Sequence, residues 1–238
     1  MSESMMSQGD ALASGNPRVF TNATSPNERV QALLQKVQGP DILHVGCVGH
    51  RVAESAAEKA HSLHHQLCQR FAAVNVLGLD TDSNGIERMK QIGFRVEVGD
   101  AQNLQFNSCF DTVLAGELIE HLQNPGRFLE GSARALKPGG TLVLSTPNVF
   151  SVMLNLMYWK NYDRAFNREH ALWFCPQTLR ELLRRGGFRI EKLEFVDDLE
   201  PALVSSRFYR AFAHGWMGLR PLLPKRFRNT MVAVCQLA

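Results

Sequence analysis

Short apolar segments rich in β-branched residues alternate in this chain with longer segments whose apolar residues recur at helical spacing. The segments that we expect to form strands are Ile42–Val45, Val74–Leu79, Arg95–Val98, Phe110–Ala115, Thr141–Ser145, Phe188–Val196 and Thr230–Leu237. Strands that alternate with helices are typical of a parallel sheet whose crossover helices cover both faces. The sequence therefore predicts an α/β fold in which ligands bind at the carboxyl ends of the strands.

The spacing of apolar residues, together with residues that begin or end helices, predicts helices between the strands. Leu63, Leu67 and Phe71 follow one another at four-residue steps, as on one face of a helix. A second helix is expected to open at Asn124-Pro125 and to close at Pro138-Gly139-Gly140, because Pro suits the first turn of a helix and Pro-Gly ends one.

The 238 residues suffice for one such domain with insertions. We expect a flexible N-terminal tail over residues 1–25 and a single domain over 26–238, with a further helix at Pro176–Arg185. Insertions at about 150–170 and 199–229 separate the later elements and are the natural places for a second ligand.

Cysteine use and apolar run lengths favour a cytoplasmic protein. The five cysteines are odd in number and have no paired spacing, which indicates reduced thiols: Cys47, Cys68, Cys109, Cys175 and Cys235. No apolar run approaches the roughly 20 residues that cross a bilayer.

Three predicted strands end in residues suited to a nucleoside. The first runs into ILHVGCVGH (42–50), where glycine lets the backbone approach a ligand with its amides pointing outward. Asp80 ends the second strand and Asp100 the third, where carboxylates can accept from ribose hydroxyls and an adenine amino group. The alternatives are an ordinary tight turn for the loop and helix N-caps for the two aspartates.

From the fourth strand onward the chain resembles a known family. FDTVLAGELIEHLQNPGRFL (110–129) and ALKPGGTLVLSTPN (135–148) look like class I S-adenosylmethionine (SAM)-dependent methyltransferases, and the likeness covers roughly residues 40–195. The GELIEH element, the STPN strand end and His170 are most similar to ubiquinone-pathway O-methyltransferases, and more distantly to small-RNA terminal 2′-O-methyltransferases. The resemblance implies a Rossmann-like sheet of seven strands, mostly parallel, with a reversed last strand.

The resemblance also implies roles for the strand ends in binding SAM. The residues that correspond by position are Gly46, Cys47, Val48 and Gly49 for the methionine part, Asp80 and Thr81 for the ribose, Asp100 and Ala101 for the adenine, and Gly116 for the sulfonium end.

The glycine loop departs from the family pattern. His44 stands where such families usually carry an acidic residue, and Val48 and His50 stand where they carry glycines. The spacing from Gly46 to Asp80 also exceeds the roughly 20 residues expected between loop and acid, so we expect Arg51–Ala60 to loop out.

Methyl transfer from a sulfonium is an in-line displacement, and a hydroxyl acceptor must also lose a proton. His121, next to Glu120 in GELIEH, and the later His170 are the candidate bases, with His121 slightly preferred. His61, His64 and His65 have no accompanying acid, and we expect them on a solvated helix face or at the rim of the site.

Glu117, Glu120 and His121 stand at i, i+3 and i+4, which places them on one face if the segment is helical. Such a set suits Mg²⁺ or Mn²⁺, with His170 as a further ligand, and members of both similar families carry a metal at corresponding residues. The alternative is that Glu120 caps a turn and His121 packs under the cofactor.

The leading functional hypothesis is O-methylation of a small molecule, a quinone-type lipid precursor or a glycan. The alternatives are RNA methylation and SAM binding without turnover; an NAD-dependent oxidoreductase fits less well because Gly46–Gly49 lacks the G-x-G-x-x-G pattern. The last 38 residues carry no Asp or Glu but six cations among aromatic residues, namely Arg207, Arg210, Arg220, Lys225, Arg226 and Arg228. This basic C-terminal segment could contact an anionic membrane surface or, with less support, nucleic acid.

Overall fold

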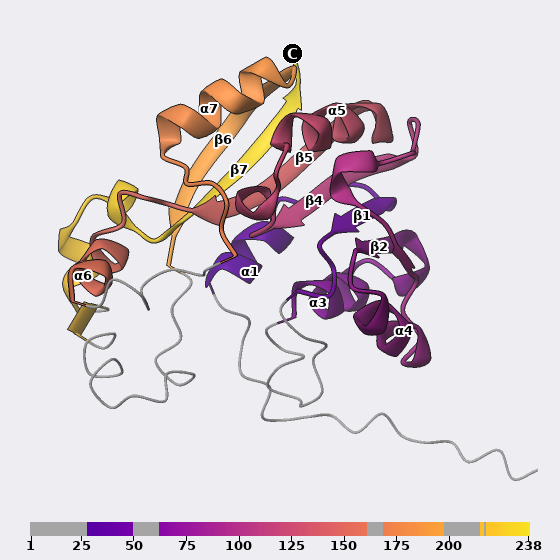
Figure 1. Cartoon of the computed structure of the whole chain (residues 1–238), viewed down its shortest axis with the longest axis horizontal. Coiled ribbons are helices and arrows are strands. Elements are labelled where there is room, and N and C mark those ends of the chain that lie inside the picture. The colour runs from indigo at the N-terminus through magenta and orange to yellow at the C-terminus, as the bar shows by residue number, and fades with distance from the viewer. Residues whose placement is uncertain (1–27, 50–61, 161–168, 198–214, 217) are drawn as a thin grey trace, which may run out of the picture.

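A computed structural model of the chain describes residues 28–49, 62–160, 169–197, 215–216 and 218–238. At its centre is one seven-stranded sheet with the order β3-β2-β1-β4-β5-β7-β6 (Figure 1). The strands are β1 (Ile42–Val45), β2 (Val76–Asp80), β3 (Val96–Val98), β4 (Phe110–Gly116), β5 (Leu136–Pro147), β6 (Phe188–Val196) and β7 (Thr230–Leu237). Strands β1 to β5 pair in parallel, whereas β7 is antiparallel to both β5 and β6. The predicted Rossmann-like sheet with a reversed last strand is confirmed.

The helices connect the strands as expected, with one boundary displaced. They are α1 (Glu28–Leu34), α3 (Leu63–Arg70), α4 (Ser83–Gln91), α5 (Pro125–Ala135), α6 (Val152–Lys160) and α7 (Pro176–Arg185), with short 3-10 turns η1 (Ala73–Asn75), η2 (Ala101–Asn103), η3 (Ile119–His121), η5 (Arg220–Leu222) and η6 (Lys225–Phe227). Asn124 caps α5 as predicted, but the helix ends at Ala135 rather than at the Pro-Gly-Gly sequence. The reason is that Leu136 already pairs with Phe110 in the sheet, so the LKPGG sequence begins β5.

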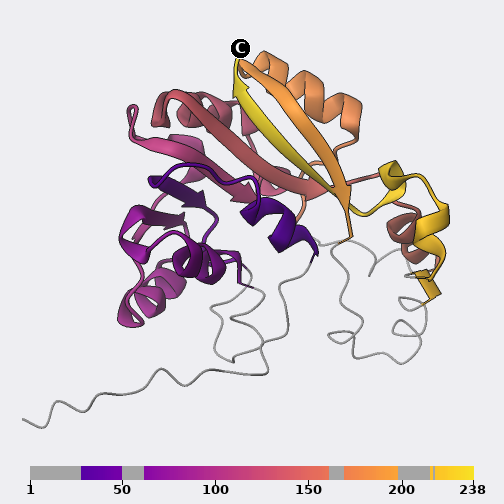
Figure 2. The ribbon, with the colours of Figure 1, turned by 180° about the vertical axis from the view of Figure 1, so that it is seen from behind.

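Alternate residues of the central strands bury against different helices, because successive side chains of a strand point to opposite faces. Leu43 and Val45 pack in the cluster that contains Phe128 of α5 and Leu183 of α7. Ile42 belongs instead to the cluster formed with α1 and α3. Both faces of the sheet are therefore covered, and Figure 2 shows α1 on the side opposite α5 and α7.

Several sequence expectations lie outside the described residues. These are the N-terminal tail, the extra loop at Arg51–Ala60 with His50 and His61, and most of both insertions. The described residues of the first insertion are 150–160, which include α6, and 169–170, and those of the second are 215–216 and 218–229. Within the described ranges, no helix is long and apolar enough to cross a membrane.

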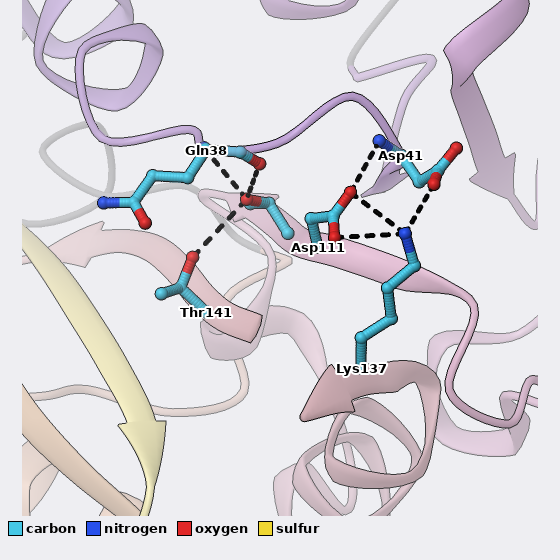
Figure 3. A network of polar contacts seen from close by, with 6 residues as sticks. Gln38, Asp41, Asp111, Lys137 and Thr141 are labelled. Carbon is cyan, nitrogen blue, oxygen red and sulfur yellow. Dashed lines mark hydrogen bonds and ion pairs between the residues drawn. The ribbon is translucent and has the colours of Figure 1, made fainter. Parts of the chain in front are cut away.

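A polar network joins the amino-terminal ends of three strands (Figure 3). The ammonium group of Lys137 contacts the carboxylates of Asp41 and Asp111 at 2.5 and 3.0 Å. The same Asp111 accepts a hydrogen bond from the backbone N–H of Asp41. The network leaves no room beside Gly39, which has φ +71° and whose added Cβ would lie 2.3 Å from Cβ of Asp111.

We predict that Gly39→Ala lowers the free energy of unfolding by about 2–4 kcal/mol, because it combines the left-handed backbone with a steric clash. Gly93→Ala is the matched control, since Gly93 has positive φ but no atom within 4 Å of its added Cβ. That control should lose only the backbone strain, about 1 kcal/mol. Urea unfolding of both variants checks the difference, and equal losses would contradict the role of Asp111.

Candidate functional site

The glycine loop after β1 is held by β2 through its backbone amides. The N–H groups of Gly46 and Cys47 both donate to the carbonyl of Leu79, at 2.8 and 3.2 Å. The N–H of Val48 donates to Oδ2 of Asp80 at 2.9 Å. The expectation that the loop amides point outward is therefore wrong for these three residues, because the loop turns back onto the neighbouring strand end.

Asp80 is positioned at the end of β2 by the amides on both of its sides. Oδ2 accepts from Val48, and Oδ1 accepts from the N–H of Asp82 at 3.0 Å. An ionised carboxylate has about four acceptor sites, so each oxygen retains capacity for a hydroxyl donor. Gly49 and Thr81, on either side, are exposed. The carboxylate can thus still accept hydrogen bonds from a ribose.

Asp100 follows β3 by two residues and begins the turn η2. Its Oδ1 accepts from the N–H of Gln102 at 2.8 Å, so the N-cap alternative holds for this residue. The N–H of Gly99 donates to the carbonyl of Asp80, which joins the ends of β2 and β3. Asp100 is exposed and Ala101 is buried, and the bond from Gly99 puts Asp100 at the same edge of the sheet as Asp80.

Gly116 ends β4 where two helices approach. A Cβ added there would lie 2.9 Å from Cδ2 of Leu63 and 3.3 Å from the guanidinium of Arg29. No larger residue fits without displacing these side chains. The glycine therefore keeps the end of β4 close to α1 and α3.

The chain changes direction immediately after Gly116. Glu117 has φ +52°, a left-handed conformation, and its N–H donates to both the carbonyl and the hydroxyl of Ser145. The turn η3 then begins at Ile119. The expected single helical face with Glu117, Glu120 and His121 is therefore wrong, because Ser145 at the end of β5 holds Glu117 outside the helical turn.

Glu120 is a buried carboxyl group, with 1% of its surface exposed. Its Oε2 accepts a hydrogen bond from Oγ1 of Thr146 at 2.9 Å, and Oε1 has no hydrogen-bond partner among the described residues. Burial, together with the nearby carboxylate of Glu117, raises the pKa of Glu120 to about 8. A buried oxygen without a partner is costly, so this position suits a ligand that approaches Oε1.

Two imidazoles lie beside Glu120. The rings of His121 and His170 are nearly perpendicular, with centroids 4.7 Å apart. The backbone carbonyl of Glu120 accepts from the amides of Ala171 and Leu172, which brings the segment of His170 to η3. One oxygen or nitrogen from each of Glu120, His121 and His170 lies within 4.8 Å of the others, a spacing compatible with one metal ion. The structure thus groups His170, rather than Glu117, with the other two residues.

Thr146 was not identified from the sequence as a site residue, although it lies in the quoted STPN element. Its side chain is fully buried and donates to Glu120. The signal that could have found it is a hydroxyl at the carboxyl end of β5, next in the sheet to β4. That inference needed the position of Glu120, which depends on the turn after Gly116.

His44, the residue that departs from the family pattern, pairs with His64 of α3. Their Nδ1 atoms are 3.1 Å apart and their rings are stacked. Both side chains are buried, so the expectation that His64 lies on a solvated face or at a rim is wrong. Burial lowers the pKa of His64 to about 4, and burial followed by the charges of His64 and Arg29 lowers the pKa of His44 well below its usual range. The pair is therefore neutral, with one imidazole donating to the other.

We predict that this pair makes the protein lose stability as the pH falls from 6.5 to 4. In that window both histidines bind a proton in the unfolded chain but not in the folded protein. For His64 alone, this difference lowers the free energy of unfolding by about 3 kcal/mol. His64→Gln can still hydrogen-bond to His44 and should show a smaller loss.

The measurement is urea unfolding at the two ends of the pH window. Gln69→Ala, an exposed and non-titratable change on the same helix, is the control and should keep the wild-type dependence. An unchanged pH dependence in His64→Gln would contradict the neutral pair.

Comparison with known proteins defines the class of this chain. A family described as a methyltransferase domain matches residues 21–193. A ubiquinone biosynthesis O-methyltransferase from Maricaulis maris is 32% identical over 162 residues, which cover 64% of this chain and 60% of the relative. A protein of the same name from Azoarcus sp. is 26% identical over 65% of this chain and 66% of the relative. The matches thus span less than two thirds of the length of these relatives.

Solved structures show the same fold. A SAM-dependent methyltransferase from Archaeoglobus fulgidus aligns with a TM-score of 0.60 and 19% identity, over 87% of this chain and 90% of that chain. Magnesium protoporphyrin IX methyltransferase from Synechocystis, solved with bound SAH, aligns with a TM-score of 0.56 and 15% identity, over 88% and 82% of the two chains. The fold is therefore that of the class I SAM-dependent methyltransferases. With the family match covering most of its length, the chain belongs to the methyltransferase-domain family.

Proposed function

We propose that this chain is an enzyme that transfers a methyl group from SAM to a hydroxyl oxygen of a small molecule. The observation that carries the proposal is the group of Glu120, His121 and His170, which lies just beyond the carboxyl end of β4. Ligands of α/β sheets bind at this edge, and Asp80 and Asp100 follow neighbouring strands there. The reacting groups and the nucleoside site therefore belong to one edge of the sheet.

In this proposal SAM lies across the ends of β1, β2 and β3. Asp80 accepts hydrogen bonds from the ribose hydroxyls, and Asp100 with Ala101 borders the adenine. Gly46–Gly49 lies along the methionine part. It contacts the ligand through atoms other than the N–H groups of Gly46, Cys47 and Val48, which are already bonded within the protein. Gly116 lies beside the sulfonium.

The reaction needs an acceptor oxygen, the methyl carbon and the sulfur in line. The imidazole of His121 or His170 takes the proton of the acceptor hydroxyl while its oxygen bonds to the methyl carbon. SAM would supply the methyl group, and the electron pair of the broken carbon–sulfur bond would remain on sulfur in S-adenosylhomocysteine, a neutral thioether. A neutral imidazole is suited to this proton transfer near pH 7.

The donor set also fits Mg²⁺ or Mn²⁺, because one carboxylate and two imidazoles converge and Oε1 of Glu120 is available. We propose Glu120, His121 and His170 as the ligands, with Glu117 contributing charge nearby. A bound ion would lower the pKa of an acceptor hydroxyl and fix its position. Thr146 positions Glu120 by its hydrogen bond to Oε2, which leaves Oε1 available for a ligand.

The acceptor class is proposed from the relatives. The names of the two O-methyltransferases from ubiquinone biosynthesis support oxygen as the methylated atom and favour a quinone-type lipid precursor over a glycan. A phenol with a neighbouring hydroxyl is the simplest compound that presents this chemistry. Such a compound can also bind a divalent ion through both of its oxygens.

We predict that the chain binds SAM and that Asp80→Asn weakens binding by about tenfold or more, because an amide NH2 faces the ribose hydroxyls in place of an acceptor. Glu97→Gln, an exposed change on β3, is the control and should leave the affinity unchanged. Titration calorimetry with SAM, S-adenosylhomocysteine and NAD checks this. Absence of binding by both sulfur nucleosides would overturn the proposed cofactor.

We predict that Glu120→Gln and His170→Gln each lower kcat for methylation of a soluble catechol by about 10²–10⁴-fold while SAM affinity is retained. His65→Gln, outside the group, should keep full activity. A chelator should abolish transfer and added Mg²⁺ or Mn²⁺ should restore it. Full activity in the chelator, with the losses in the variants unchanged, would reject the metal and retain the base.

A further inference from the structure

One end of the molecule carries exposed apolar side chains. We call it the apolar end and define it as Phe150 with α6, together with residues 215–216 and 218–229. Figures 1 and 2 both show α6 beside residues 218–229, at one end of the molecule and away from the centre of the sheet. Trp159 is 86% exposed and Leu222 is 80% exposed.

The exposure is concentrated rather than scattered. Six of the eleven exposed large hydrophobic side chains in the described residues belong to the apolar end, namely Phe150, Leu156, Tyr158, Trp159, Leu219 and Leu222. Single exposed apolar residues need no explanation, but a contiguous group marks a surface that binds another apolar phase.

The helix α6 is apolar around most of its circumference. Apart from the hydroxyl of Tyr158, its sequence has only Asn155 and Lys160 as polar residues, and the amide group of Asn155 donates to the carbonyls of Val149 and Ser151 just before the helix. A cavity of about 770 Å³ lies beside the helix, lined by Phe150, Leu156, Pro176, Arg226 and Phe227 among others. The surface is thus hollowed as well as apolar.

The charges of the apolar end have one sign. Neither 148–160 nor 215–229 contains Asp or Glu. Lys225 and Arg226 are exposed, and the ion pairs found among the described residues involve neither. Arg226 also lines the cavity and lies over the ring of Phe227, so a cation stands at the border of the apolar surface.

The other cations of the basic C-terminal segment have a different role where the structure describes them. Arg220 pairs with Glu28 and Asp197, and Arg228 pairs with Glu28. These pairs attach the segment to α1 and to the end of β6. Trp216, an aromatic residue of the same segment, is buried.

We propose that the apolar end binds the surface of an anionic lipid bilayer. Trp159, Leu222 and their neighbours enter the boundary between headgroups and acyl chains, while Lys225 and Arg226 meet the phosphate groups. A bilayer is favoured over RNA because apolar side chains dominate the surface and two exposed cations are few for phosphate-backbone recognition. This partner surface is independent of the methylated acceptor.

The test is sedimentation of the full chain, without SAM or acceptor, with vesicles of phosphatidylcholine mixed with phosphatidylglycerol. Binding should be at least tenfold weaker with phosphatidylcholine alone and should weaken with added salt. The double variant Lys225→Gln/Arg226→Gln should lose about 25-fold in affinity for the mixed vesicles. Trp159→Ser should lose about tenfold.

Matched controls separate this surface from general charge and apolarity. Arg88→Gln/Lys90→Gln removes two exposed cations from α4, and Val74→Ser removes an exposed apolar residue near the amino end of β2. Both should bind vesicles as the wild type does. Losses equal to those of the apolar-end variants would overturn the proposal.

A partner other than a bilayer at the apolar end would give a different result in these assays. Self-association that Trp159→Ser abolishes, without vesicle binding, would assign the surface to a second copy and overturn the proposal. Binding of single-stranded RNA without vesicle binding would overturn it as well. Because the assay contains no SAM, vesicle binding by a chain that fails to methylate a catechol would support this inference and reject the proposed activity separately.

Discussion

Parallel pairing of β1, β2, β3 and β4 is the constraint on which the site depends, because it brings the carboxyl ends of four strands to one edge. Each strand is short, so the residues that follow it lie at this same edge of the sheet. The glycine loop, Asp80, Asp100 and the turn at Glu117 are therefore neighbours in space although 70 residues separate the first from the last. Burial on both faces of the sheet keeps this edge in register, because a one-residue slip would exchange the two packed faces.

At this edge the protein satisfies some polar groups internally and leaves others to a ligand. Amides of the glycine loop bond to Leu79 and Asp80, so the loop is already rigid before a nucleoside arrives. Glu120 presents the opposite situation, since one oxygen is bonded to Thr146 and the other lies buried without a partner. A buried oxygen without a hydrogen-bond partner lowers the stability of the fold. A reacting group or ion that binds to this oxygen offsets the lost stability.

The ion pairs around Glu28 determine which surfaces remain available to partners. Arg220 and Arg228 are used to join the C-terminal segment to α1 and β6. Their charge is thereby neutralised, and two exposed cations, Lys225 and Arg226, remain in the described part of the segment. The position of α6 beside them combines aromatic residues from one insertion with cations from another.

Apolar periodicity and helix caps, which are local signals of burial, predicted the strands and the helices α3, α5 and α7 from the sequence alone. The family resemblance implied the mostly parallel sheet with its reversed last strand. Position and resemblance also put forward Asp80, Asp100, Glu120, His121 and His170 as candidate site residues. Tertiary structure decided the rest: the end of α5, displaced by pairing of Leu136 with β4; the exclusion of Glu117 from the helical turn; and the contacts of His44 with His64 and of Thr146 with Glu120. These contacts join side chains 20 or more residues apart, and no local pattern encodes which distant side chain fills the space beside a buried polar group.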